Sequence, residues 1–111
     1  MTSNADIIEA MLEAFNAQDM DAFCAHFAED CIVGELNGAT AYRGHAGLRS
    51  HFGATWEKHP QNRVWVTQRI AVGNTVVDHE FGERSPGGDG FEIIAVYTFR
   101  DGRIVRMETA R

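Results

Sequence analysis

The second half of the chain, from Arg63 to Thr109, contains four strand-like runs separated by turn signals, and this pattern restricts the fold more than any other feature. β-branched and aromatic residues fill the runs, which cover residues 64–72, 75–81, 91–100 and 103–108. Gly73-Asn74 follows the first run and Asp101-Gly102 the third, and both dipeptides suit the positive φ of tight hairpin turns. A Gly-rich loop, residues 85–90, connects the middle two. The sequence predicts an antiparallel meander.

Three helices are predicted before this meander. The first follows a capping box formed by Ser3 and Asp6, and the second follows Asp19 as its N-cap. The third begins at Gly44 and ends before Pro60, because the residue before a proline avoids helical geometry. Each helix carries one apolar face at helical spacing: Ile8, Met11, Leu12 and Phe15 in the first; Met20, Phe23, Cys24 and Phe27 in the second; and Leu48, Phe52 and Trp56, joined by His51 and Thr55, in the third.

A short hairpin is predicted between the second and third helices. Its strands are residues 30–36 and 39–43, and Asn37-Gly38 is a strong turn dipeptide between them. Helices followed by a sheet predict an α+β fold in which the helices pack inside a curved, mostly antiparallel sheet and leave a pocket. With 111 residues and an ordinary globular composition, we expect one domain over residues 1–111.

The acidic composition argues against several classes of partner. The net charge is −6, whereas binding to nucleic acid or to an anionic membrane requires clustered Lys and Arg. No segment approaches the ~18 apolar residues of a membrane span, and the first residues lack the basic and apolar regions of a signal peptide. We therefore expect a cytoplasmic protein with no nucleic-acid and no membrane partner.

Cysteine and histidine spacing gives no sign of a metal site. Cys24 and Cys31 lack CxxC spacing, and the five histidines form neither an HxH nor an HExxH pattern. Cys24 lies on the apolar face of the second predicted helix, where we expect a small buried hydrophobe. We expect no bound metal and no cofactor.

Apolar residues occur on both faces of the predicted strands. In the run 91–100, one face carries Phe91, Ala95, Tyr97 and other apolar residues, and the opposite face still carries Ile94 and Val96. One face can cover the helices, but an antiparallel sheet facing water would be polar on its other side. A second copy of the chain is the simplest cover, so we expect a homodimer packed through the outer sheet faces.

Three consecutive polar residues, Asp78, His79 and Glu80, occupy the run 75–81. Because successive strand residues point to opposite faces, either both carboxylates face the pocket with Val76, or His79 does so with its apolar neighbours. Inward carboxylates would have raised pKa values through desolvation, which suits a general acid or base. The alternative is an edge position or a salt-bridge network between two protomers.

Local patterns across the chain resemble the nuclear transport factor 2-like superfamily, in particular its small SnoaL-like bacterial members. The matching stretches are residues 14–21, 27–31, 42–49, 76–80 and 97–104. The resemblance implies a cone of three helices closed by a strongly curved mixed sheet, which is usually dimeric. This fold carries isomerases, epoxide hydrolases, dehydratases, polyketide cyclases and non-enzymatic binding modules, so the resemblance is specific for fold and not for reaction.

Two kinds of enzyme within this superfamily can be compared residue by residue. The general base of the ketosteroid isomerases falls near Glu35, while Met11 and Ala95 stand where those enzymes have a tyrosine and a protonated aspartate. Both oxyanion donors are missing, which argues against the standard isomerase mechanism. Limonene epoxide hydrolase-like members carry Trp-Arg-Asp on the last strand, where this chain has Met107-Glu108-Thr109 and lacks the aspartate.

Two functions are therefore predicted. The first is an isomerase- or cyclase-type enzyme in which Glu35 or Glu80 removes a proton next to a carbonyl and His51, His79 or Tyr97 donates a hydrogen bond to the developing oxyanion. The second is a non-enzymatic dimeric module that binds a small hydrophobic or amphipathic molecule. The residues expected to contact the ligand are Met11, Phe15, Phe27, His51, Phe52, Trp56, Asp78, Ala95 and Met107.

Overall fold

The computed structural model describes residues 2–111 and contains three helices and one six-stranded mixed sheet, which confirms the predicted α+β fold. The helices are α1 (Asn4–Ala17), α2 (Met20–Ala25) and α3 (Gly44–Lys58). The strands are β1 (Phe27–Glu35), β2 (Thr40–Arg43), β3 (Arg63–Val72), β4 (Thr75–Glu83), β5 (Gly90–Arg100) and β6 (Arg103–Ala110).

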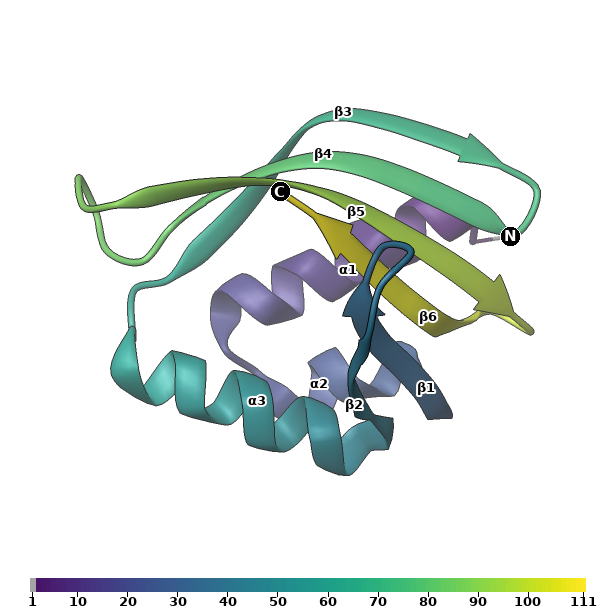
Figure 1. Cartoon of the computed structure of the whole chain (residues 1–111), viewed down its shortest axis with the longest axis horizontal. Coiled ribbons are helices and arrows are strands. Elements are labelled where there is room, and N and C mark those ends of the chain that lie inside the picture. Colours follow the sequence, from purple (N-terminus) through teal and green to yellow (C-terminus); the bar gives the residue numbers. More distant parts are fainter. Residues whose placement is uncertain (1) are drawn as a thin grey trace.

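The sheet has the strand order β2-β1-β6-β5-β4-β3. All neighbouring strands are antiparallel except β1 and β6, which run parallel. The predicted meander is thus the part from β3 to β6, and the first hairpin extends it at the β6 edge. Figure 1 shows the sheet curving over the helices, with α1 beneath β3, β4 and β5. The helix α3 packs against α2 and directly against β1 and β2.

Local signals explain where the helices begin and end. The hydroxyl of Ser3 accepts from the backbone N–H of Asp6, and the Asp6 carboxylate accepts from the Ser3 N–H, which confirms the capping box. Gln18 ends α1 with a φ of 56°, and Asp19 caps α2 by accepting from the Ala22 N–H. These two ends turn the chain so that α2 packs beside α1.

Two boundaries differ from the predictions. Phe27, predicted on the second helix, is the first residue of β1, because α2 stops at Ala25 after less than two turns. The first hairpin turns through the four residues 36–39 and not through Asn37-Gly38 alone. The Glu35 backbone both donates to the Ala39 carbonyl and accepts from the Gly38 N–H, which closes this wider turn.

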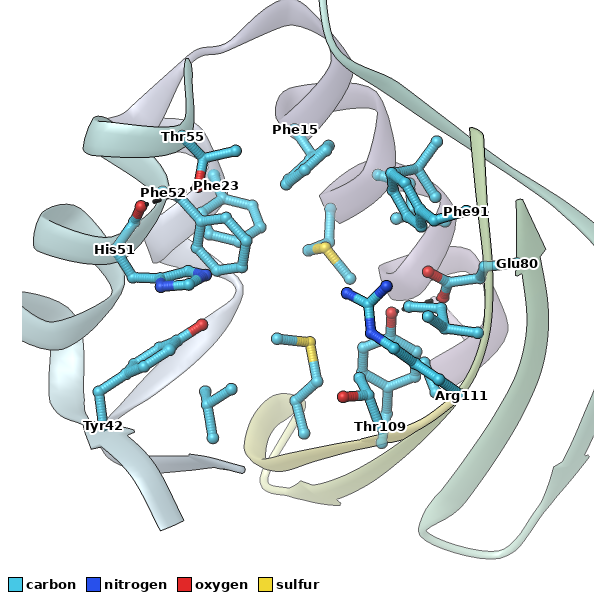
Figure 2. A pocket seen from close by; sticks show the side chains of 18 of the residues that line it. Phe15, Phe23, Tyr42, His51, Phe52, Thr55, Glu80, Phe91, Thr109 and Arg111 are labelled. Carbon is cyan, nitrogen blue, oxygen red and sulfur yellow. Dashed lines mark hydrogen bonds between the residues drawn. The ribbon is translucent and has the colours of Figure 1, made fainter. Parts of the chain in front are cut away.

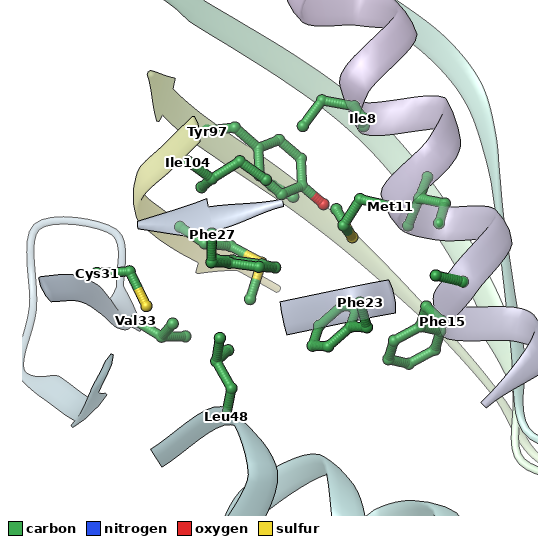
Figure 3. Close-up of a cluster of buried hydrophobic side chains, with 14 of the residues drawn as sticks. Ile8, Met11, Phe15, Phe23, Phe27, Cys31, Val33, Leu48, Tyr97 and Ile104 are labelled. Atoms are coloured by element: carbon green, nitrogen blue, oxygen red, sulfur yellow. The ribbon is translucent and has the colours of Figure 1, made fainter. Parts of the chain in front are cut away.

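The core lies between the concave face of the sheet and the helices. Figure 3 shows Ile8 and Met11 of α1 beside Tyr97 of β5, and Phe15 of α1 beside Phe23 of α2. The side chain of Leu48 on α3 points toward the same cluster. Phe15, Phe23 and Trp56 pack edge to face or tilted, with ring centroids 5.4–5.8 Å apart. This aromatic cluster fixes α3 against the two other helices.

The two faces of the sheet alternate strictly along β4. Val76, Asp78 and Glu80 are buried on the concave side, whereas Val77 and His79 are half-buried on the convex side. The first of the two predicted arrangements is therefore the one observed.

No helix within residues 2–111 is long and apolar enough to cross a membrane.

Candidate functional site

A cavity of about 370 Å³ lies between the concave sheet face and the helices α1 and α3. Such a volume is within the range, roughly 300–1,000 Å³, of small-molecule sites. Apolar and aromatic side chains form most of its wall, as Figure 2 shows for Phe15, Phe52 and Phe91. Nine of the residues predicted to form the site line it: Met11, Phe15, Glu35, His51, Phe52, Glu80, Ala95, Tyr97 and Met107.

Four predicted site residues do not line the cavity. Phe27 and Trp56 are buried in the core beneath it, where Phe27 packs on Phe23 at 5.1 Å between ring centroids. Asp78 points inward but is fully buried behind the cavity wall. His79 is on the convex face, where its Nε2 lies 2.5 Å from a Glu92 carboxylate oxygen. Its position outside the cavity argues against the role predicted for it as an oxyanion donor.

Glu80 and Tyr97 form a buried hydrogen bond on the sheet side of the cavity. The Tyr97 hydroxyl donates to Oε2 of Glu80 at 2.7 Å, and the two residues are only 1% and 3% exposed. Figure 2 shows the Glu80 carboxyl group at the cavity wall with this hydrogen bond behind it. No other residue in the range 2–111 donates to the carboxyl group, so Oε1 keeps a free acceptor position.

Burial shifts the pKa of both groups. Desolvation is the main cause that raises the pKa of Glu80 to about 7, helped by the negative charge of Asp78; the Tyr97 hydrogen bond and Arg69 oppose the rise. Desolvation also raises the pKa of Tyr97 well above its usual value, so its hydroxyl keeps its proton. Glu80 can therefore take up or release a proton near neutral pH, the property of a general acid or base.

The Tyr97 hydroxyl plays a different part from the one predicted for it. Its proton already forms the hydrogen bond to Glu80, so it is not free for the oxyanion of a ligand. Tyr97 instead fixes the orientation of the Glu80 carboxyl group and favours its ionised form. We therefore regard Tyr97 as a positioning residue.

Behind Glu80, an ion-pair cluster connects the sheet to α1. The Arg69 guanidinium donates to both carboxylate oxygens of Asp78, at 2.7 and 2.9 Å, and to Glu9 at 2.6 Å. This bidentate geometry gives the fully buried Asp78 a matched positive partner. Asp78 is thereby part of the support of the site and not of its surface.

The opposite wall carries polar groups from α3 and β2. The rings of His51 and Tyr42 stack at 4.7 Å between centroids, and Figure 2 shows both facing Glu80 across the cavity. Among residues 2–111, neither the Tyr42 hydroxyl nor the His51 ring has a hydrogen-bond partner. Burial and the charge of Arg84 lower the pKa of His51, and burial raises that of Tyr42. Both groups are therefore neutral donors at pH 7.

Glu35, the other predicted base, lines the cavity at the end of β1 but is exposed to solvent. An exposed carboxylate in water is a weaker candidate for a tuned base than a buried one. Within residues 2–111, no three His, Cys, Asp or Glu side chains are arranged so that they could hold a metal ion.

Several lining residues were not predicted. Tyr42, Thr55, Arg84, Phe91, Thr109 and Arg111 line the cavity. Phe91 shares strand parity with Ala95 and Tyr97, so alternation along β5 could have identified it. Strand alternation could not identify the two arginines, because Arg84 follows the end of β4 and Arg111 follows the end of β6.

Comparisons with known proteins identify the family and the fold of the chain. A SnoaL-like domain family model matches residues 8–107. The structure of an uncharacterized cystatin-fold protein from Novosphingobium aromaticivorans is 30% identical, with a TM-score of 0.92 and full coverage of both chains. A candidate polyketide cyclase from Sinorhizobium meliloti is 24% identical, with a TM-score of 0.80 over 95% of this chain and 94% of its own.

TerC, in a crystal with polyporic acid, is 22% identical, with a TM-score of 0.76 over 96% of this chain and 89% of its own. Because the Sinorhizobium meliloti protein and TerC are both less than 25% identical to this chain, their similarity concerns the fold alone. A comparison with curated proteins finds no significant match. The family model covers most of the chain, and the predicted resemblance is confirmed: the chain belongs to the SnoaL-like domain family.

Proposed function

We propose that the cavity binds a small, mostly apolar carbonyl compound and that Glu80 moves a proton at the carbon next to the carbonyl. The observation that carries this proposal is the Glu80 carboxyl group itself. It lies in an apolar cavity, it is fixed by Tyr97, and its pKa is raised to about 7. A carboxyl group with this pKa is both sufficiently ionised and sufficiently basic at neutral pH.

The proton transfer follows from the two facing walls. Oε1 of Glu80 takes the proton from the carbon, and the C–H electron pair moves to form an enolate whose charge rests on the former carbonyl oxygen. The His51 ring N–H or the Tyr42 hydroxyl, on the opposite wall, donates a hydrogen bond to that oxygen. In an isomerisation, Glu80 then returns the proton to a different carbon of the conjugated enolate. In a ring closure, the enolate carbon instead attacks a second carbonyl carbon of the same compound, and Glu80 gives the proton to the alkoxide that forms.

Relatives with this fold support a small-molecule ligand. TerC was crystallised with polyporic acid, and another relative is named as a candidate polyketide cyclase. We transfer only the class of ligand, a compact organic molecule, because both identities are below 25%. The lining of Phe15, Phe52 and Phe91 favours an aromatic or otherwise apolar body.

Deuterium exchange into model carbonyl compounds tests the proposal without knowledge of the natural substrate. Benzoylacetone and tetralone have acidic C–H groups, and NMR in heavy water measures the loss of these protons. We expect the protein to accelerate exchange and Glu80→Gln to reduce the acceleration about 100-fold or more. Glu57→Gln, at an exposed position of α3, is the matched control and keeps full activity.

A binding module without catalysis gives a different result in the same experiment. The compounds would bind, as shown by shifts of protein NMR signals, but the exchange rate would equal that of buffer. Equal exchange rates for the parent protein and Glu80→Gln, with both folded, would also exclude Glu80 as the proton carrier.

We further propose that two chains pack through their convex sheet faces. Trp65, Ile70, Val72 and Ile94 on that face are 40%, 67%, 73% and 37% exposed. Strand register places Ile70 opposite Val77 and Trp65 opposite Phe81, so apolar side chains from β3, β4 and β5 share this face on both sides of the His79–Glu92 pair. Apolar surfaces of this kind are typical of protein–protein contacts.

A further inference from the structure

Two arginine side chains at one side of the cavity have no acidic partner. Arg84 and Arg111 line the cavity, and neither forms an ion pair with any residue in the range 2–111. Five other arginines do have such partners: Arg49, Arg63, Arg69, Arg100 and Arg106. Within the same range, Arg43 and Arg103 also lack an acidic partner, but both are exposed and lie outside the cavity, whereas Arg84 and Arg111 line it.

One aromatic ring brings the two guanidinium groups together. The Arg84 guanidinium carbon lies 4.7 Å from the centroid of the Phe91 ring, and that of Arg111 lies 5.8 Å from the same centroid. Each contact is a cation–π interaction, and Phe91 itself lines the cavity. Figure 2 shows the Arg111 guanidinium near Phe91, pointing toward the middle of the cavity.

Arg84 is also held in place from behind. Its Nη1 donates to Oδ1 of Asn62 at 3.0 Å, and Asn62 is only 1% exposed. A neutral amide fixes the position of the guanidinium without cancelling its charge. Arg84 is therefore ordered and half-buried while its charge stays available to the cavity.

Arg84 is half-buried, whereas Arg111 is exposed at the edge of the cavity. Their like charges repel, and burial together with Arg111 lowers the pKa of Arg84. The cavity carboxyl groups do not relieve this repulsion, because neither Glu35 nor Glu80 lies within ion-pair distance of these arginines. An anionic group bound between the guanidinium groups would relieve it and would receive charge-assisted hydrogen bonds.

We propose that Arg84 and Arg111 form an anion-binding subsite, and that the ligand of this cavity is an amphipathic carbonyl compound with an acidic group, such as a carboxylate. This inference names the class of ligand and rests on the proposed function for the carbonyl end. The acidic group lies between the arginines beside Phe91, and the apolar body extends along Phe15 and Phe52.

Two fluorescent probes with the same ring skeleton test the subsite. Anilinonaphthalene sulfonate carries an anionic group, and phenylnaphthylamine lacks it. We expect Arg84→Gln and Arg111→Gln each to weaken binding of the sulfonate about tenfold and to change binding of the neutral probe by less than about twofold. Arg103→Gln removes an exposed arginine outside this cavity and leaves both probes unaffected.

The neutral probe separates the possible failures. If it binds but the arginine variants do not weaken the sulfonate selectively, the anion subsite is excluded while the apolar cavity of the proposed function remains. If neither probe binds the parent protein, both ideas are wrong. Arg84→Lys guards against a folding effect, because it keeps the positive charge and therefore retains most of the sulfonate selectivity if the subsite exists.

Discussion

Arg69 and Asp78 form a bidentate ion pair between adjacent strands, with N–O distances of 2.7 and 2.9 Å, directly behind the cavity wall. The Asp78 side chain is fully buried, whereas that of Arg69 is 17% exposed and also reaches Glu9 on α1. The pair thus neutralises a carboxylate that the fold has placed in the core. It also sets the charge that Glu80, two residues along β4, experiences.

Removing one partner of this pair destabilises the protein strongly. Arg69→Met leaves the Asp78 carboxylate buried without a counter-charge, so we expect a loss of about 3 kcal/mol in the free energy of unfolding. Arg63→Met on the same strand removes a more exposed ion pair with Glu83 and a cation–π contact with Trp65, and we expect it to cost about 1 kcal/mol or less. Urea titration measures the free energy of unfolding of both variants. Equal losses would show that the buried pair stabilises the protein no more than the exposed pair does.

Glu80 makes stability fall as the pH rises toward neutrality. Its pKa is about 7 in the folded chain and near its ordinary value of 4.5 in the unfolded chain, so between these values only the unfolded state ionises. Each pH unit in this range changes the free energy of unfolding by about 1.4 kcal/mol, so the contribution of Glu80 to it falls by about 3 kcal/mol from pH 4.5 to pH 7. Urea unfolding of the parent protein and of Glu80→Gln, measured across this pH range, isolates the contribution of Glu80. If the difference between their free energies of unfolding did not change with pH, the raised pKa would be wrong.

Tyr97→Phe moves the titration of Glu80 upward. The Tyr97 hydroxyl stabilises the ionised carboxylate, so its removal raises the pKa of Glu80 further above 7. Carbon NMR of labelled glutamate follows this titration directly. If Glu80 is the base, the midpoint of the pH profile for deuterium exchange into the carbonyl compounds rises together with this pKa. A lower NMR midpoint would mean that the hydrogen bond favours the neutral acid.

The sequence was sufficient for the fold because each element carries its own local signal. The capping box at Ser3, the turns at Gly73-Asn74 and Asp101-Gly102, and strand alternation all act over a few residues. Alternation also placed Ala95 and Tyr97 on the same strand face, which is the concave one in the structure. Phe27 was misplaced because an apolar residue at helical spacing also fits the start of a buried strand.

The site was less predictable because it depends on contacts between distant segments. Alternation could pair Asp78 with Glu80 on one face, but it could not show that Arg69 would form an ion pair with Asp78 and not with Glu80. That difference leaves Glu80 as the carboxyl group with the raised pKa. Tyr42 and the arginines reach the cavity through the first hairpin and strand ends, which carry no periodic signal.

Gly82 makes room for Phe91 at the anion subsite. A Cβ atom at this position would overlap the Phe91 ring, so Gly82→Ala displaces the ring that both arginines contact. We expect a loss of about 1–3 kcal/mol of stability from overpacking, together with weaker binding of both fluorescent probes. Gly53→Ala on α3 is the control, because its added Cβ makes only an ordinary contact at 3.9 Å. Unchanged probe binding in Gly82→Ala would show that Phe91 does not shape the site.

The convex face predicts how the chains associate. Ile70 is 67% exposed on β3 and lies at the proposed contact between two chains, so Ile70→Lys places an unpaired charge in an apolar interface. We expect the parent chain of 12.3 kDa to sediment as a dimer and Ile70→Lys to sediment as a monomer. Leu36→Lys is matched in chemistry but lies in the turn after β1, away from this face, and keeps the dimer. A monomeric parent chain at micromolar concentration, or a dimer that Leu36→Lys disrupts and Ile70→Lys does not, would place the contact elsewhere.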